Sequence, residues 1–139
     1  KFEKIKKMKN IFLAVFAVAA MFSCSSMSSS KSRGAQTNIA GTNWTLADNV
    51  KGKKPTLNIE SGKITGNAGC NNYFGELSLD ATAGNFIVKN VGSTRMSCDN
   101  MEVESQFLRM LNEADKYVVS GNTLELYKGN LLLMKLNKE

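Results

Sequence analysis

The chain has 139 residues, of which 42% are hydrophobic and 22% are charged, enough for one folded domain with additional segments. Its 18 basic and 12 acidic residues give a net charge of +6, but the first ten residues hold five lysines and one glutamate, which leaves 13 basic and 11 acidic residues elsewhere. This near balance argues against nucleic acid binding, and the absence of histidine excludes Ser-His-Asp catalysis, Cys-His catalysis and His-containing zinc sites.

The first predicted element is the apolar segment Ile11–Phe22, which follows the basic start. As a helix, this segment would rise about 18 Å, which is too short for a hydrocarbon core of about 30 Å. The pattern is typical of a secretory signal peptide, predicted over residues 1–23, and the alternative is a buried core helix.

Cys24 follows directly, and its context Phe22-Ser23-Cys24 resembles the lipobox of bacterial lipoproteins. In that family, the cysteine thiol takes a diacylglycerol and becomes the mature N-terminus. Phe22 departs from the small residue that is usual there, so ordinary signal peptidase cleavage is the alternative. Residues 24–39 are rich in serine and predict a lipidated flexible tether. The folded domain is expected over 40–139, anchored through lipid in the cell envelope on the periplasmic side of the outer membrane.

The domain alternates apolar and polar residues in short runs separated by turn signals, which predicts strands. The run Leu131–Met134 is continuously apolar and predicts a central strand buried on both faces, or else the wall of a lipid pocket. Strands are expected at Thr42–Leu46, Thr56–Glu60, Lys63–Asn67, Tyr73–Leu79 and Asn85–Lys89, and in a C-terminal meander from Tyr117 to Leu136.

The segment from Asp99 to Lys116 carries apolar residues at helical spacing, with Asp99 placed to cap its first turn. Short connections between the strands imply antiparallel pairing, and the helix must bury its apolar stripe on the sheet. The predicted fold class is therefore α+β: a strongly curled antiparallel sheet or partly open β-barrel of about seven strands, with one helix packed on it.

Besides Cys24, the chain has two cysteines, Cys70 and Cys98. An even pair in an exported domain predicts a disulfide between them. Two reduced buried thiols, or a thiol with redox or nucleophilic activity, are the alternatives. No Cys-x-x-Cys spacing and no histidine support the active thiol, and two cysteines alone make a poor zinc site.

The surroundings of these cysteines, Gly66 to Gly75 and Thr94 to Cys98, resemble two hallmark segments of the META domain family, which includes heat-inducible bacterial lipoproteins of the HslJ type. The resemblance covers about residues 41–136. It implies a small curled β-structure with a helix, similar in fold to pilot lipoproteins of secretins, and association with envelope stress, drug tolerance, and in some members motility or secretion. No catalytic activity is established for the family, so the resemblance implies no catalytic residues. No cofactor and no metal are expected.

Within these segments, Asn71, Thr94 and Arg95 are the candidate binding or structural residues. Asn71 can satisfy backbone groups in a turn. The Arg95 guanidinium can form a bidentate pair of hydrogen bonds with a carboxylate or phosphate, or it can tie loops together through carbonyl groups.

Three functions follow as hypotheses. The first is a non-enzymatic envelope module, related to stress, that binds a protein or stabilises an assembly. The second is a pilot-like or carrier-like protein that binds a lipid or acyl chain. The third is a thiol redox activity, which needs a reactive Cys70 or Cys98. The expected partners are the membrane, through the lipid anchor, and either an envelope protein or an apolar ligand.

Overall fold

The computed structural model describes residues 35–99 and 101–139. The signal peptide, the lipidated Cys24 and most of the predicted tether lie outside the described residues. The described part forms eight strands and one helix, rather than about seven strands. In chain order these are β1 (Thr42–Leu46), β2 (Thr56–Glu60), β3 (Lys63–Asn67), β4 (Asn72–Asp80), β5 (Asn85–Ser93), α2 (Met101–Glu113), β6 (Lys116–Ser120), β7 (Thr123–Lys128) and β8 (Leu131–Lys138).

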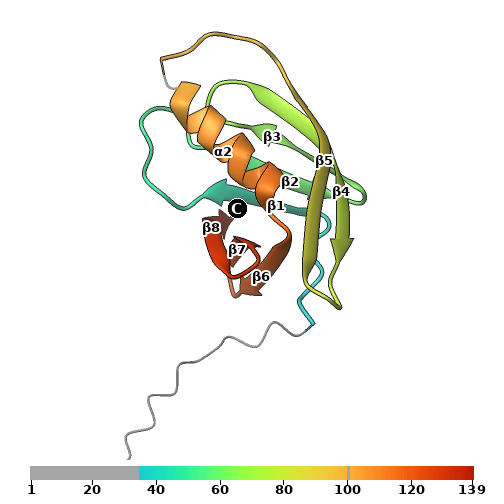
Figure 1. The fold of residues 1–139 in the computed structure, drawn as a ribbon. Coiled ribbons are helices and arrows are strands. Elements are labelled where there is room, and N and C mark those ends of the chain that lie inside the picture. The colour runs from blue at the N-terminus through green and yellow to red at the C-terminus, as the bar shows by residue number, and fades with distance from the viewer. Residues whose placement is uncertain (1–34, 100) are drawn as a thin grey trace, which may run out of the picture. The chain divides into compact units, whose positions relative to one another are not determined.

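The strands form a closed antiparallel barrel in which each strand pairs with the next and β1 pairs with β8 (Figure 1). Alternation along each strand decides which side chains face the interior. In β4, for example, Tyr73 and Leu77 are buried while Phe74 and Glu76 are exposed. Closure leaves few open strand edges, which is how small β-domains avoid unwanted pairing.

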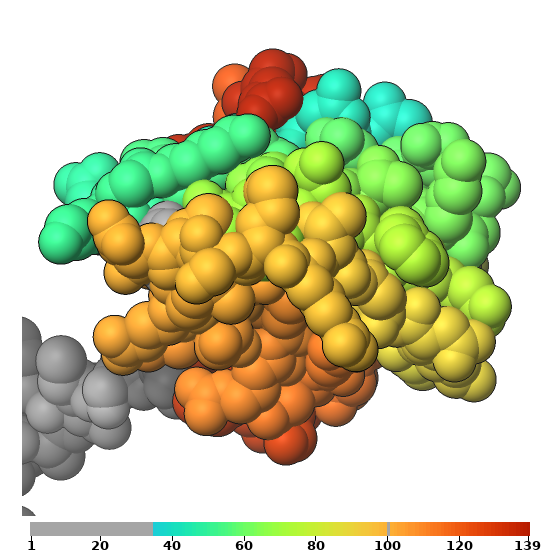
Figure 2. Space-filling view, turned by 90° about the horizontal axis from the view of Figure 1, so that it is seen from above, coloured from blue at the N-terminus to red at the C-terminus, as the bar shows by residue number. Residues whose placement is uncertain are grey.

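The closure is weakest between β5 and β6, where a single pair, Asn85 with Lys116, joins the two strands. Helix α2 contacts both β5 and β7, and it buries Phe107 and Leu111 against the barrel core. Figure 1 shows α2 lying across the barrel beside β5, and Figure 2 shows α2 and the segment before it on the face seen from above. The expected partly open barrel is therefore a closed one, with a narrow junction beside the helix.

The helix ends at Glu113, before the predicted Lys116, because the residues that follow form hydrogen bonds with β7. The N–H of Asp115 donates to the carbonyl oxygen of Tyr127 at 2.8 Å, and Lys116 pairs with Tyr127 as the first residue of β6. Helical spacing of apolar residues continued across this boundary, but pairing with β7 decides the backbone conformation there.

Residues 36–39, which the sequence placed in the flexible tether, pack against the barrel instead. Ile39 is 2% exposed within the core, and the phenol of Tyr117 donates to the carbonyl oxygen of Thr37 at 2.9 Å. The N–H of Gln36 donates to the carbonyl oxygen of Ala81 at 2.6 Å. The folded domain therefore begins earlier than residue 40, because Ile39 supplies a buried side chain.

The prediction that Leu131–Met134 is buried on both faces was wrong. Leu131 is 64% exposed and Leu132 is 39% exposed, while Met134 is 2% exposed. The pairing of β1 with β8 reaches only Leu136, followed by a bond from the Ala47 N–H to the Lys135 carbonyl oxygen. The start of β8 therefore extends past its neighbour β1, and one of its faces lies on the outside of the barrel.

Gly66 lies where three strands approach closely, and we predict that Gly66→Ala destabilises the protein by about 2–3 kcal/mol. A Cβ atom on Gly66 would collide with the carbonyl oxygen of Thr56 and would lie 2.9 Å from the Tyr73 hydroxyl. Because the first of these is backbone, the strands themselves must move. Urea denaturation monitored by circular dichroism measures the effect.

The control is Gly121→Ala, where φ is +58° and nothing lies within 4 Å of the new Cβ atom. That variant carries only backbone strain, about 1–2 kcal/mol. Equal stability of Gly66→Ala and the wild type would contradict the close approach at Gly66.

Candidate functional site

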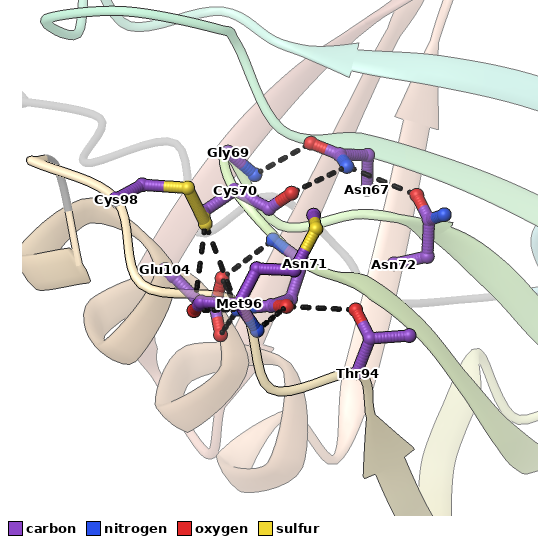
Figure 3. The surroundings of a disulfide bond; sticks show 9 residues. All are labelled: Asn67, Gly69, Cys70, Asn71, Asn72, Thr94, Met96, Cys98 and Glu104. Atoms are coloured by element: carbon purple, nitrogen blue, oxygen red, sulfur yellow. Dashed lines mark hydrogen bonds between the residues drawn. A yellow bond between two sulfur atoms is a disulfide. The ribbon is translucent and has the colours of Figure 1, made fainter.

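Three segments meet at the α2 end of the barrel: residues 68–71 between β3 and β4, residues 94–98 between β5 and α2, and the first turns of α2. Cys70 and Cys98 are joined by a disulfide with Cα atoms 6.1 Å apart, in agreement with the pairing predicted from the cysteine count. Cys70 is 7% exposed and Cys98 is half-buried. Figure 3 shows the disulfide and the polar side chains beside it.

Asn71 lies at the centre of this cluster and is 1% exposed. Its amide oxygen accepts hydrogen bonds from the Thr94 hydroxyl and from the Met96 N–H, each at 2.7 Å. Its amide nitrogen donates to the Met96 carbonyl oxygen at 3.0 Å and to both carboxylate oxygens of Glu104 at 3.1 Å. One side chain thus joins two loops and the helix (Figure 3).

Glu104 is the second buried member, with 5% of its surface exposed. Its Oε2 also accepts the backbone N–H of Asn71 at 2.8 Å, so the amide and backbone of Asn71 replace the water that this carboxylate loses on folding. Glu104 lies one turn into α2, where the helix dipole favours negative charge. The sequence offers one signal for this role: Glu104, Phe107 and Leu111 share one helix face, and a lone acid among apolar residues needs a polar partner.

The turn that presents Cys70 and Asn71 is held by Asn67. Its amide nitrogen donates to the Cys70 carbonyl oxygen at 3.1 Å and to the Asn72 side-chain oxygen at 3.0 Å. Its amide oxygen accepts the N–H of Gly69 at 3.0 Å. Gly69 has φ of +111°, a conformation that L side chains rarely adopt. Asn67 was not among the candidate residues, although an asparagine side chain often accepts the N–H two residues later in a turn, as Asn67 does from Gly69.

Of the three candidate residues, the structure brings Asn71 and Thr94 together but leaves Arg95 apart from them. Arg95 is exposed, and no hydrogen bond or ion pair joins it to any other described residue. Within the described part of the chain, Arg95 therefore has no bond through which it could tie loops together. Asn71 makes those ties instead, because its amide both donates and accepts.

The chemistry open to this cluster is limited by how fully its groups are bonded. Within residues 35–99 and 101–139, no buried side-chain nitrogen or oxygen lacks a hydrogen-bond partner. The same residues contain no group of three or more Cys, Asp or Glu side chains that could hold a metal ion. The cluster is therefore a hydrogen-bonded network that holds three segments together, and its buried donors and acceptors bond to one another.

Tyr73 lies beneath the cluster and connects it to the barrel core. Its ring centre is 5.7 Å from that of Phe107 on α2, and its hydroxyl donates to the Thr56 carbonyl oxygen at 2.8 Å. Burial raises the pKa of the Tyr73 phenol far above its ordinary value of 10.0. Burial and then the nearby Asp80 carboxylate raise the pKa of Tyr117 in the same direction.

We predict that stability falls as the pH rises above about 10, because the unfolded chain then loses phenol protons that the folded protein retains. Each such tyrosine contributes a slope of up to about 1.4 kcal/mol per pH unit between its unfolded and folded pKa values. The Tyr73→Phe variant should show a shallower slope above pH 10 and a loss of about 1 kcal/mol at pH 7, where its hydrogen bond is missing.

Urea denaturation between pH 7 and pH 11 measures both effects. Tyr127→Phe is the comparison variant, because it removes a half-buried phenol that donates to the Glu125 side chain. An unchanged alkaline slope in Tyr73→Phe would contradict the burial argument.

Two hollows lie at the other end of β4, away from the disulfide. The first has a volume of about 380 Å³ and the second about 320 Å³. They share Gly62, Leu77 and Ser78 in their walls. Exposed residues such as Ser61 and Gly62 border them, so both open to solvent.

No helix in the described residues has the length and apolar character needed to cross a membrane.

Known proteins share the family and the fold of this chain. Residues 37–139 match the family model of the META domain. The fold is similar to the NMR structure of a protein from Burkholderia xenovorans, with 21% identity over 73% of this chain and 83% of that chain and a TM-score of 0.61. It is also similar to the crystal structure of a DUF4847 family protein from Bacteroides vulgatus ATCC 8482, with 16% identity over 71% of this chain and 93% of that chain and a TM-score of 0.56. No curated protein matches the sequence.

Proposed function

Because the chain belongs to the META domain family, we propose that its folded domain is a non-enzymatic module of the bacterial cell envelope that binds another protein. Cys24 would carry the lipid that anchors it, and residues 24–35 would serve as the tether. On this proposal, the domain faces the periplasm from the outer membrane and acts in envelope stress.

The observation that carries the proposal is the internal bonding of the cluster around Asn71. A catalytic centre keeps at least one acid, base or nucleophile available to substrate. Here the thiols are joined to each other, and Glu104 accepts its bonds from Asn71. Asn71 and Thr94 of the two family segments are thus used to hold loops in place, which suits a binding scaffold.

The packing of the barrel interior argues against the lipid carrier as the main function. Twelve large side chains with less than 2% exposure fill the interior, among them Trp44, Phe86 and Tyr117. An acyl chain needs an apolar cavity, and the two hollows described above are bordered by polar residues such as Glu60 and Ser78. A thiol redox activity has less support still, since it requires the Cys70–Cys98 bridge to open.

The test combines anchoring with partner capture. Intact-mass analysis of the mature protein from cells should show a diacylglycerol-modified Cys24 as first residue and the two-hydrogen loss of one disulfide. Crosslinked membranes from the same cells should yield a reproducible partner, and a deletion strain should lose tolerance to envelope stress. A Cys24→Ser strain separates loss of anchoring from loss of the domain.

Recovery of the chain in the cytosol with its first twenty-odd residues intact would overturn the envelope assignment. An unchanged deletion strain, together with crosslinked membranes that yield no partner, would overturn the binding role.

A further inference from the structure

The sulfur atoms of the described residues fall into two groups with different redox chemistry. Cys70 and Cys98 share the disulfide, so neither offers the thiolate that reacts with oxidants. The remaining sulfurs are the thioethers of Met96, Met101, Met110 and Met134. A thioether can still lose two electrons and become a sulfoxide, and dedicated reductases reverse this change. A two-electron oxidant such as a peroxide is therefore expected to react with this domain at methionine.

Access to solvent separates these methionines from one another. Met96 is 56% exposed and Met101 is 38% exposed, whereas Met134 is 2% exposed in the barrel core. Met110 is half-buried and packs against that core. Because an oxidant must reach a lone pair of the sulfur, Met96 should react first and Met134 last.

Met96 combines this exposed side chain with a main chain that is held on both sides. Its N–H donates to the Asn71 amide oxygen at 2.7 Å, and its carbonyl oxygen accepts from the Asn71 amide nitrogen at 3.0 Å. Two residues later, the disulfide ties Cys98 to Cys70. Figure 3 shows the Met96 side chain beside Asn71, close to the disulfide. None of these bonds involves the Met96 thioether, so a chemical change at its sulfur leaves them in place.

Met134 shows what the same oxidation does at a buried position. Its side chain belongs to the core cluster together with Leu126, its partner across β7 and β8. A sulfoxide oxygen there would be buried among apolar side chains without a hydrogen-bond donor, which destabilises the folded state. At Met96, water can solvate the sulfoxide oxygen instead, so the folded protein tolerates it.

We propose that Met96 is a reversible oxidation site, at which a peroxide converts the thioether into a sulfoxide while the barrel stays folded. The sulfur bonds to one peroxide oxygen as the O–O bond breaks, and the other oxygen takes up a proton and leaves as water. The sulfur gives up two electrons, and the peroxide accepts them. Two thiols of a methionine sulfoxide reductase return the electrons, form a disulfide and release the oxygen as water.

This oxidation gives the proposed envelope module a way to respond to an oxidant without unfolding. A sulfoxide replaces an apolar surface by a polar one in the segment 94–98, and reduction restores the original surface. The inference rests on the proposed function for its compartment, which is open to external oxidants. The order of reactivity among the methionines depends only on the domain itself.

The first experiment measures the rate at each methionine of the purified full chain. The protein is incubated with excess hydrogen peroxide at pH 7, and peptide mass spectrometry follows the gain of one oxygen atom at each position. Met96 should react about tenfold or more faster than Met134, with Met101 and Met110 between them. Methionine sulfoxide reductases of both stereospecificities, added together, should then return Met96 to the thioether.

The second experiment separates exposure from burial with two matched variants. Glutamine has a polar side chain of similar length and serves as a mimic of the sulfoxide. Met96→Gln should melt within about 3 °C of the wild type, because the new amide remains in water. Met134→Gln should melt about 10 °C or more lower, because its amide is buried among apolar side chains. Thermal unfolding followed by circular dichroism measures both variants.

The same mapping is then applied to protein recovered from cells exposed to peroxide, in a strain that lacks the reductases. Sulfoxide at Met96 in a chain processed at Cys24 supports both proposals. Recovery of the intact chain from the cytosol, with Met96 still the fastest site in the purified protein, would overturn the envelope assignment and leave the oxidation site standing. Equal rates at Met96 and Met134, loss of the fold in step with oxidation of Met96, or a Met96 sulfoxide that resists the reductases would overturn the oxidation site.

Discussion

Replacing Asn71 with leucine should destabilise the protein by about 3–5 kcal/mol, the largest effect we expect from one substitution. Leucine has a similar size but lacks the amide that serves both loops and the helix. The variant leaves the Glu104 carboxylate buried, with the Asn71 backbone N–H as its one remaining donor among the described residues. It also removes the acceptor for the Thr94 hydroxyl and the Met96 N–H. Urea denaturation at pH 7 provides the measurement.

A double-mutant cycle distinguishes the loss of this pairing from poor packing of leucine. If the buried carboxylate causes most of the loss, the double variant Asn71→Leu/Glu104→Leu should be more stable than Asn71→Leu alone. Removing both polar partners costs less than leaving one of them buried without its hydrogen bonds. A single Asn71→Leu variant that stays within about 1 kcal/mol of the wild type would contradict the central role of Asn71.

Removing the disulfide with the double variant Cys70→Ala and Cys98→Ala should cost about 3–4 kcal/mol. The two cysteines are 28 residues apart, and a crosslink over a loop of that length restricts the unfolded chain by about this amount. For a domain of about 100 residues, the melting temperature should fall by about 15–25 °C. Thermal unfolding followed by circular dichroism measures the shift.

The wild type treated with dithiothreitol is the control, since reduction removes the same crosslink without changing the packing of either side chain. It should melt close to the double variant. Equal melting temperatures for the oxidised and reduced wild type would show that the bridge does not contribute to stability. The double variant is preferred because a single cysteine left unpaired can form a disulfide between two molecules.

The free-energy losses caused by Asn71→Leu and by removal of the disulfide should not be additive. The disulfide and Asn71 both join the loop at residues 68–71 to the segment at residues 94–98. Once one connection is lost, the other holds a less ordered pair of segments. Residues that share such a network commonly show coupling of about 0.5–3 kcal/mol.

Local patterns in the chain were sufficient to predict most of the strands and the cysteine pair. Alternation in Thr56–Glu60 and Lys63–Asn67, separated by Ser61 and Gly62, is a two-residue hairpin signal, and both strands form as expected. The helix was also recognisable, because Phe107 and Leu111 repeat at helical spacing and must face a core. These features depend on residues close together in the chain, so they can be predicted from the sequence.

The features that no local pattern contains are those set by distant neighbours. Alternation says which face of a strand is apolar, but only the length of β1 decides that the start of β8 lies past it with Leu131 exposed. Likewise, a turn asparagine can bond to many groups, and only the placement of α2 brings Glu104 to Asn71 across 33 residues of chain. Ile39 became a core residue for the same reason: burial depends on which strands close around a side chain, and closure is a property of the whole barrel.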